Sequence, residues 1–351
     1  MPAPSPAAPG TDEPVRLEIV GESAAGETGE LPEVAAGETV RVFTGGRVPR
    51  GADTILRQER GRREGDRLVV ERSVSKGKDL RPVGEELAQG SAMIEPGTRL
   101  DERHLAALSM TGHAEVAIHR EPSILLLVSG DEVVAPSKPL EPGEIYDANT
   151  PFLEGLLRRL GHGSLEVRHV EDRREAVETE LDDGLSAFDL VVSSGGVSVG
   201  DYDFLPTAAE GLGAEQIFWN VSQKPGRPVF FAVRDQTPFL GLPGNPGAVF
   251  VGAHLYLRRL LDRREGVSNA RPEMRPGRLA ESISRSSKLR WSPCRVEFEQ
   301  GARVELQPIG GGRAHRMGQM FRADALARID AGEGTAEAGE VVDWLPVGSY
   351  L

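Results

Sequence analysis

Hydrophobic residues recur with a different spacing in successive parts of the chain. Up to about residue 84, short apolar runs alternate with glycine-containing turns. Between residues 122 and 265, apolar runs of strand length alternate with longer stretches of helical periodicity, and beyond residue 266 that periodicity is lost. The pattern predicts a β-rich domain, then an α/β domain, then a second β domain.

We expect five segments. They are a disordered tail rich in Pro, Ala and Ser (1–15), a β-rich domain (16–84), a linker segment with a helix (85–121), an α/β domain (122–265) and a C-terminal β-barrel (266–351). Strand–helix alternation favours a doubly wound parallel sheet, with ligands at the carboxyl ends of its strands.

The individual elements are placed by the same periodicity. Strands are expected at 15–20, 39–43, 54–56, 67–74, 116–119, 124–128, 164–170, 188–192, 229–232, 295–298, 302–307 and 341–345. Helices are expected at 102–110, 149–161, 173–186 and from about 249 to 261.

Composition narrows the functional classes. The formal net charge is -13, which disfavours nucleic-acid binding and means that local donors must hold any anionic ligand. The single cysteine, Cys294, excludes an intrachain disulfide and suits a reducing compartment. No apolar run is long enough to span a membrane, and the first residues lack the order of a secretory signal. We therefore expect a cytoplasmic protein that acts away from membranes.

The most informative stretch is residues 193–203, SSGGVSVGDYD, directly after a buried strand. Glycines let the backbone approach a ligand closely, and main-chain N–H groups and hydroxyls can surround phosphate oxygens. Two acids follow, which is consistent with a divalent cation bridging them to a phosphate. The candidate residues are Ser194, Gly195, Gly196, Ser198 and Gly200 for the anion, and Asp201 and Asp203 for the metal.

Two further loops suit anions. In GLPGNP, residues Pro243, Gly244 and Asn245 precede a helix, and helix N-termini attract anions. In KPGRP, prolines stiffen a turn that presents Lys224 and Arg227.

In this order and spacing, the three motifs resemble the molybdopterin molybdenumtransferase (MoeA) family, which includes the E domain of gephyrin-type proteins. Further similar motifs are RVFTGG (41–46), VSGDE (128–132) and IYDAN (145–149), and the resemblance extends from about residue 16 to the C-terminus. It implies an α/β plus β fold, in which a central MoaB/Mog-like doubly wound domain lies between a β-rich domain and a C-terminal β-barrel.

The resemblance also implies a function in molybdenum cofactor biosynthesis. Such a protein accepts adenylylated molybdopterin, releases AMP and inserts molybdenum from molybdate. The family implies Mg²⁺ as cofactor, a homodimer, and contact with molybdopterin adenylyltransferase. The glycine loop would hold the pterin or AMP phosphates, and Lys224 and Arg227 would meet the anions, while Asp131 and Glu132 would share the metal or act on water together with the metal ligand Asp203.

Structural explanations remain open for the same residues. Glycine–serine stretches are commonly turns, Asp201, Asp203 and Asn245 could cap helices, and Lys224 and Arg227 could be surface cations. Asp131 and Glu132 could only begin a turn. Tyr146 is more often a core residue than a stacking partner for a pterin, and Asp147 and Asn149 would fix a turn or a cap.

Several positions depart from the family pattern. The usual first helix and "SxMDGYA" segment have no match, so we expect an N-terminally shortened member. GEEL (84–87) replaces "GEDI", and residues 311–316 lack the serine of "GxQxS". Two hypotheses follow: an active molybdenum insertase, or a catalytically impaired paralogue that binds molybdopterin as carrier, scaffold or partner subunit. A nucleotide hydrolase of the competence-damage type is a third alternative.

Overall fold

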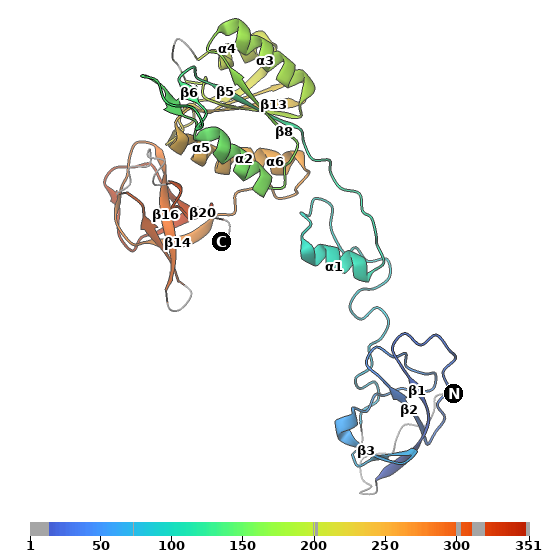
Figure 1. Ribbon diagram of the computed structural model, residues 1–351. Helices are drawn as coiled ribbons and strands as arrows, with labels where there is room; N and C mark the ends of the chain where they lie inside the picture. Colours follow the sequence, from blue (N-terminus) through green and yellow to red (C-terminus); the bar gives the residue numbers. More distant parts are fainter. Residues whose placement is uncertain are drawn as a thin grey trace. The chain divides into compact units, whose positions relative to one another are not determined.

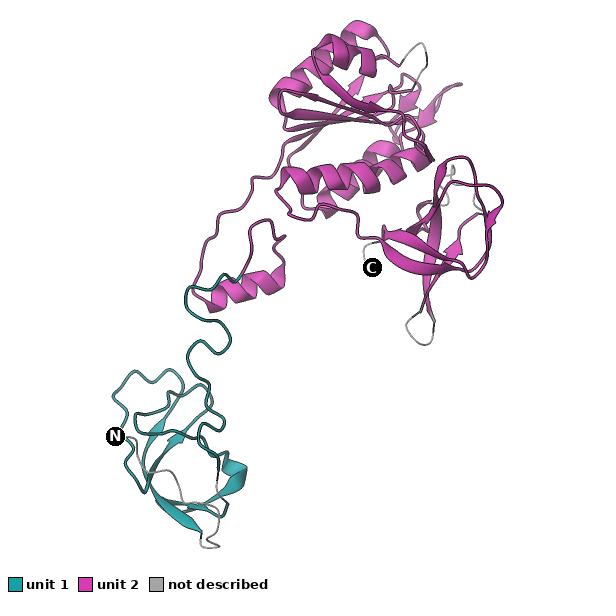
Figure 2. Ribbon diagram, turned by 180° about the vertical axis from the view of Figure 1, so that it is seen from behind, with its two compact units in different colours: residues 1–93 teal, residues 94–351 magenta. Residues whose placement is uncertain are grey.

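The computed structural model describes residues 14–72, 74–198, 200, 203–299, 303–310 and 320–348. The chain divides into two compact units, residues 1–93 and 94–351 (Figure 2). Nearly all of the predicted tail lies outside the described residues, as do Asp201 and the stretch 311–316.

The first unit contains a four-stranded sheet in the order β2-β1-β4-β3. β1 runs parallel to β2 and antiparallel to β4, and β4 forms a hairpin with β3. Gly65, with φ +63°, lies in the hairpin turn, where a left-handed backbone favours glycine. The prediction of a strand at 54–56 was wrong, because these residues belong to no ladder among the described residues. The elements are β1 Val15–Ser23, β2 Glu38–Val42, the 3-10 helix η1 Gln58–Arg60, β3 Gly61–Glu64 and β4 Arg67–Val70.

The second unit begins with the linker segment. Helix α1 (Glu102–Met110) occupies the predicted residues, and Asp101 caps it by accepting hydrogen bonds from the backbone of its first turn. The linker is fixed to the α/β domain by Arg99, which pairs with Asp262 at 2.7 Å and with Glu265 at 2.6 Å. The prediction of a strand at 116–119 was wrong, because this segment finds no neighbouring strand among the described residues.

A six-stranded sheet in the order β10-β12-β13-β9-β5-β8 forms the centre of the α/β domain (Figure 1). β8, β5, β9 and β13 are parallel, as predicted for a doubly wound sheet, and β12 is antiparallel to both of its neighbours. The strands are β5 Ile124–Ser129, β8 Leu165–Val170, β9 Leu190–Ser194, β10 Glu215–Trp219, β12 Phe230–Arg234 and β13 Thr237–Leu242.

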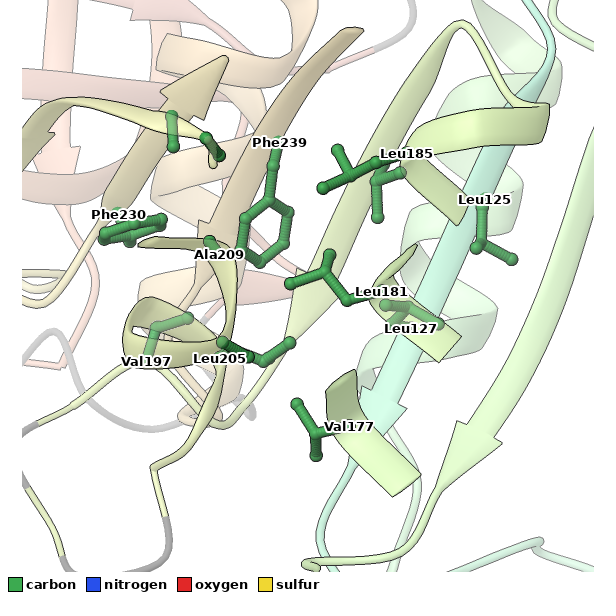
Figure 3. Close-up of a cluster of buried hydrophobic side chains, with 14 of the residues drawn as sticks. Leu125, Leu127, Val177, Leu181, Leu185, Val197, Leu205, Ala209, Phe230 and Phe239 are labelled. Atoms are coloured by element: carbon green, nitrogen blue, oxygen red, sulfur yellow. The ribbon is translucent and has the colours of Figure 1, made fainter. Parts of the chain in front are cut away.

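Helices cover both faces of this sheet (Figure 1). Leu125 and Leu127 of β5 pack with α3 and α4 on one face (Figure 3), whereas Ile124 and Leu126 pack with α2 and the last helical run on the other. Both faces of β5, β9 and β13 are therefore buried, so a ligand can reach these strands only at their ends. The helices are α2 Asn149–Arg159, α3 Arg174–Ala187, α4 Leu205–Gly211, α5 Pro246–Gly252, the π-helical η2 Ala253–Leu257 and α6 Arg258–Arg264.

The C-terminal domain is a closed five-stranded barrel, as predicted. Its strands follow the order β16-β17-β14-β20-β18, and β18 pairs back to β16. A short strand of the α/β domain, β11 (Gln223–Lys224), adds to the barrel by pairing in parallel with β16. The barrel strands are β14 Arg275–Leu279, β16 Leu289–Glu299, β17 Arg303–Pro308, β18 Ala325–Ile329 and β20 Val341–Pro346, and β15 Ile283–Ser284 pairs with β19 Thr335–Ala336 beside them.

No helix in the described part of the chain has both the length and the apolar character needed to cross a membrane.

Candidate functional site

A pocket of about 490 Å³ opens at the carboxyl ends of β5, β9 and β13. Ligands bind at this edge in doubly wound folds, because the loops that follow parallel strands meet there. The pocket brings together residues from separate parts of the α/β domain. It is lined by Val128, Ser129, Gly130, Glu132, Val133, Ile145, Tyr146, Asp147, Ala148, Asn149, Asp172, Ser194, Gly195, Gly196, Gly200, Asp203, Gly244, Asn245 and Pro246.

The glycine loop lies close against the end of β5. Gly195 and Gly196 have φ values of +94° and +69°. A Cβ atom on Gly195 would lie 2.9 Å from the main-chain oxygen of Ser129, and one on Gly196 would lie 2.8 Å from the Ser129 hydroxyl. Both positions therefore require glycine, for backbone conformation and for space.

Asn149 joins this loop to the GLPGNP loop. Its side-chain amide donates to the Ser194 hydroxyl and to the main-chain oxygen of Gly244, both at 2.8 Å. Asp147 in turn accepts from the amides of Asn149 and Thr150, so the predicted turn and cap are present. The two loops are thus neighbours at one edge of the sheet.

The loop amides divide into two groups. Gly195 donates its N–H to Leu242 at 3.0 Å, and Gly200 donates to the carboxylate of Asp203 at 2.9 Å. The amides of Gly196 and Gly244 have no acceptor among the described residues. Two of the predicted anion donors are therefore already engaged, while two others in the pocket remain free to bind a ligand.

Asn245 acts as a helix cap, one of the alternatives that its sequence position allowed. Its side chain accepts from the N–H of Gly247 at 3.0 Å. The helical run that begins at Pro246 continues through η2 and α6, so its N-terminus points toward the pocket with the partial positive charge of a long helix.

Four acidic residues line the pocket: Glu132, Asp172, Asp203 and Asp147, the last of which is engaged by the amides at the start of α2. Asp131 does not line it, and its carboxylate instead accepts from the backbone N–H of Asp172 at 3.2 Å. The pKa of Asp172 is raised, chiefly because partial burial desolvates the carboxylate, with further contributions from the charges of Asp131 and Glu132.

The sequence analysis did not identify Asp172 as a site residue, because nothing in its local sequence distinguishes it from the many other acidic residues. The signal that could have revealed it is its position two residues after β8, a strand that ends at the same edge of the sheet as the glycine loop.

None of the residues of the KPGRP loop (224–228) lines the pocket. Lys224 belongs to β11, and Gly226 approaches the main-chain oxygen of Ala248 in the first turns of α5. Lys224 and Arg227 are exposed, and neither forms an ion pair with another described residue. Ser198 and Pro243 are also absent from the lining.

Tyr146 lines the pocket and belongs to a two-stranded parallel ribbon, β6 (Val133–Val134) and β7 (Ile145–Tyr146). It is 47% exposed, so the expectation that it packs in the core was wrong. The sequence pattern cannot distinguish an aromatic residue in the core from one that lines a cavity, because either can stand in a short apolar run such as Ile145–Tyr146.

Comparison with protein-family models covers most of the chain. Residues 5–112 match the MoeA N-terminal region (domain I and II), residues 125–263 match the probable molybdopterin binding domain, and residues 276–347 match the MoeA C-terminal region (domain IV). The chain belongs to the MoeA family. Every residue that lines the pocket lies within the part that matches the probable molybdopterin binding domain.

Curated relatives agree with this MoeA assignment. The chain is 28% identical to a protein of Nostoc sp. named molybdopterin molybdenumtransferase, over 95% of this chain and 72% of the relative. It is 29% identical to the Haemophilus influenzae protein of the same name, over 95% of this chain and 83% of the relative.

A solved structure has the same architecture. The molybdopterin biosynthesis MoeA protein from Pyrococcus horikoshii has a TM-score of 0.75 to this chain at 25% identity, over 96% of this chain and 82% of that one. The MoeA fold that the motifs implied is therefore confirmed.

Proposed function

We propose that this MoeA-family protein inserts molybdenum from molybdate into adenylylated molybdopterin, with release of AMP, in molybdenum cofactor biosynthesis. The observation that supports this most directly is the convergence of the glycine loop and the start of α5 on one pocket, fixed by the two hydrogen bonds of Asn149. This arrangement suits a ligand with a phosphate group near its centre.

The pocket can hold an anion despite the net charge of -13. The amides of Gly196 and Gly244 and the N-terminus of the helical run at Pro246 supply local positive potential. Lys224 and Arg227 flank Gly226, which approaches the first turns of α5, and neither has an ion-pair partner among the described residues. We assign to them the recruitment of molybdate or phosphate.

The carboxylates of the pocket fit Mg²⁺. No group of three His, Cys, Asp or Glu side chains within the described residues is arranged as a closed metal site. Mg²⁺ does not need one, because it commonly binds through one or two carboxylates, water and substrate phosphates. Asp203, oriented by its bond from Gly200, and Glu132 would supply the protein ligands, and the ion would neutralise phosphate charge.

The chemical step is cleavage of a phosphoanhydride, in which a protein mainly positions the phosphates and stabilises developing charge. The backbone at Gly195 and Gly196, which is packed closely against Ser129, would provide the positioning. We propose that Asp131, through its bond to the Asp172 amide, holds the acidic side of the pocket in place. Asp201 lies outside the described residues.

The decisive test is molybdate-dependent release of AMP from adenylylated molybdopterin by the purified protein. Asp203→Asn should reduce this turnover by about 100-fold or more, because a metal ligand and its charge are lost. Asp235→Asn, in the exposed β12–β13 turn, is the matched control and should have the wild-type rate. Tight binding of the adenylate without turnover would contradict the insertase proposal and favour an impaired paralogue.

We further propose that the protein acts in the cytoplasm as a homodimer. In its support, α1 and the following segment expose Leu105 (60%), Met110 (63%) and Ile118 (75%), and apolar side chains of this kind favour a covered surface. Sedimentation should show a dimer, and Leu105→Glu with Ile118→Glu should shift it to monomer. A monomeric wild-type protein at micromolar concentration would contradict the proposal.

A further inference from the structure

The pocket has an apolar wall as well as its polar one. Val133, Ile145 and Tyr146 of the β6–β7 ribbon line it, while Ser194, Gly195, Gly196 and Gly244 line it from the strand ends. Ile145 is 54% exposed and Tyr146 is 47% exposed. Large apolar side chains that line a polar cavity without being buried are typical of sites that cover the apolar part of a ligand.

The Tyr146 side chain is only partly covered by the rest of the protein. Tyr146 belongs to none of the buried apolar clusters found among the described residues, and neither does Ile145. Burial in the core therefore does not account for an aromatic residue at position 146. Contact with a ligand would bury the part of the Tyr146 ring that the protein leaves exposed to solvent.

The ribbon holds this ring at a defined place. The N–H of Ile145 donates to the main-chain oxygen of Glu132 at 2.8 Å, and the N–H of Asp147 donates to the main-chain oxygen of Val134 at 2.9 Å. Asp147 is fixed further by the first two amides of α2. The backbone on both sides of Tyr146 is thus anchored, so little conformational entropy is lost when a ligand binds to its side chain.

We propose that Tyr146 is the stacking residue for a planar heteroaromatic ring of the substrate. This assignment rests on the proposed function, because adenylylated molybdopterin has two such rings, pterin and adenine, on either side of its phosphates. Phosphates at the glycine loop would leave one ring facing the ribbon across the pocket. Tyr146 then determines specificity for a ring-bearing ligand over a simple phosphate.

The test compares the binding of metal-free molybdopterin and of AMP to wild type, Tyr146→Ala and Tyr146→Phe. Tyr146→Ala should weaken one of the two ligands by about 5- to 100-fold, the range for loss of one base–aromatic stack. Tyr146→Phe keeps the ring face and should stay within about twofold of wild type. Ile217→Ala removes a similarly exposed apolar side chain from the edge strand β10 and should change neither affinity.

The outcomes separate the two proposals. A selective loss for molybdopterin identifies the pterin as the stacked ring, and a selective loss for AMP identifies the adenine. If Tyr146→Ala binds both ligands as wild type does, or if Tyr146→Phe loses as much as Tyr146→Ala, the stacking assignment is overturned while the proposed function stands. If wild type binds neither ligand and releases no AMP, the proposed function itself fails. Thermal melting shows whether each variant is folded. We expect that the Tyr146 variants fold, because this side chain is half exposed.

Discussion

The side-chain amide of Asn149 donates a hydrogen bond of 2.8 Å to the main-chain oxygen of Gly244. Its second N–H group is directed to the Ser194 hydroxyl, also at 2.8 Å. One residue at the start of α2 therefore sets the spacing of the two loops that form the polar wall of the pocket. Its effect on ligand binding is indirect, through the position of the loops.

Asn149→Asp should separate this positioning role from simple packing. The substitution keeps the shape of the side chain but replaces both N–H donors with a carboxylate oxygen that faces a carbonyl. We expect a loss of about 1–3 kcal/mol in the free energy of unfolding and at least a tenfold weaker binding of adenylylated molybdopterin. Denaturant titration and equilibrium binding measure the two effects. Asn269→Asp, at an exposed position, is the control, and equal behaviour of the two variants would refute the role of Asn149.

Two glycine substitutions should affect different properties, stability in one case and ligand affinity in the other. Gly195→Ala places a methyl group 2.9 Å from the Ser129 carbonyl at a φ of +94°, and should cost about 1–3 kcal/mol of stability. At Gly244 the nearest atom to an added Cβ is the Gly195 Cα at 3.7 Å, an ordinary contact. Gly244→Ala should therefore melt within about 2 °C of wild type yet bind the adenylate more weakly, because the methyl group occupies pocket space. Calorimetry and binding assays distinguish the pair.

Asp172 should make the stability depend on pH. Its raised pKa means that the folded state binds this proton more tightly than the unfolded state does, so its unfavourable effect grows as pH rises above the unfolded pKa of about 3.9. Asp172→Asn should then be more stable than wild type at pH 7, by less than about 1 kcal/mol because the carboxylate is only partly buried and solvent still screens its charge. The difference should disappear below pH 4. A variant that is less stable at pH 7 would show that the carboxylate makes a favourable contact instead.

Cys294 should be unreactive in the native protein. The thiol lies in the barrel core, and burial raises its pKa to about 12. Since the thiolate is the reactive form, a thiol reagent should label the native chain at least about 100-fold more slowly than the denatured chain. Labelling in increasing denaturant would follow opening of the barrel. Rapid labelling of the native protein would mean that the barrel opens readily.

Much of the fold follows from local pattern, because β5 and β9 each begin with a continuous apolar run that is followed by a glycine-containing loop. The barrel was harder to predict. β14 contains a proline and a glycine, and β18, with the sequence ALARI, favours a helix by composition. Their strand conformation depends on neighbours distant in sequence.

The same limit applies to the site. The glycine loop could be placed at a strand end from its sequence, since it directly follows an apolar run. The bond from Asn149 to Gly244 joins residues 95 positions apart, and Asp172 enters the pocket only because β8 lies next to β5. No local pattern contains such information, and it appears only once the strand order is known.

The parallel pairing of β11 with β16 gives Lys224 an unusual setting. Lys224 lies opposite Arg290, and the N–H of Leu289 donates to the main-chain oxygen of Ser222 at 3.2 Å. The basic turn between β10 and β12 of the α/β sheet is therefore part of the hydrogen-bonded framework of the barrel. A movement of the barrel relative to the α/β sheet would therefore also move Lys224. The C-terminal domain could in this way change the positive electrostatic potential near the start of α5.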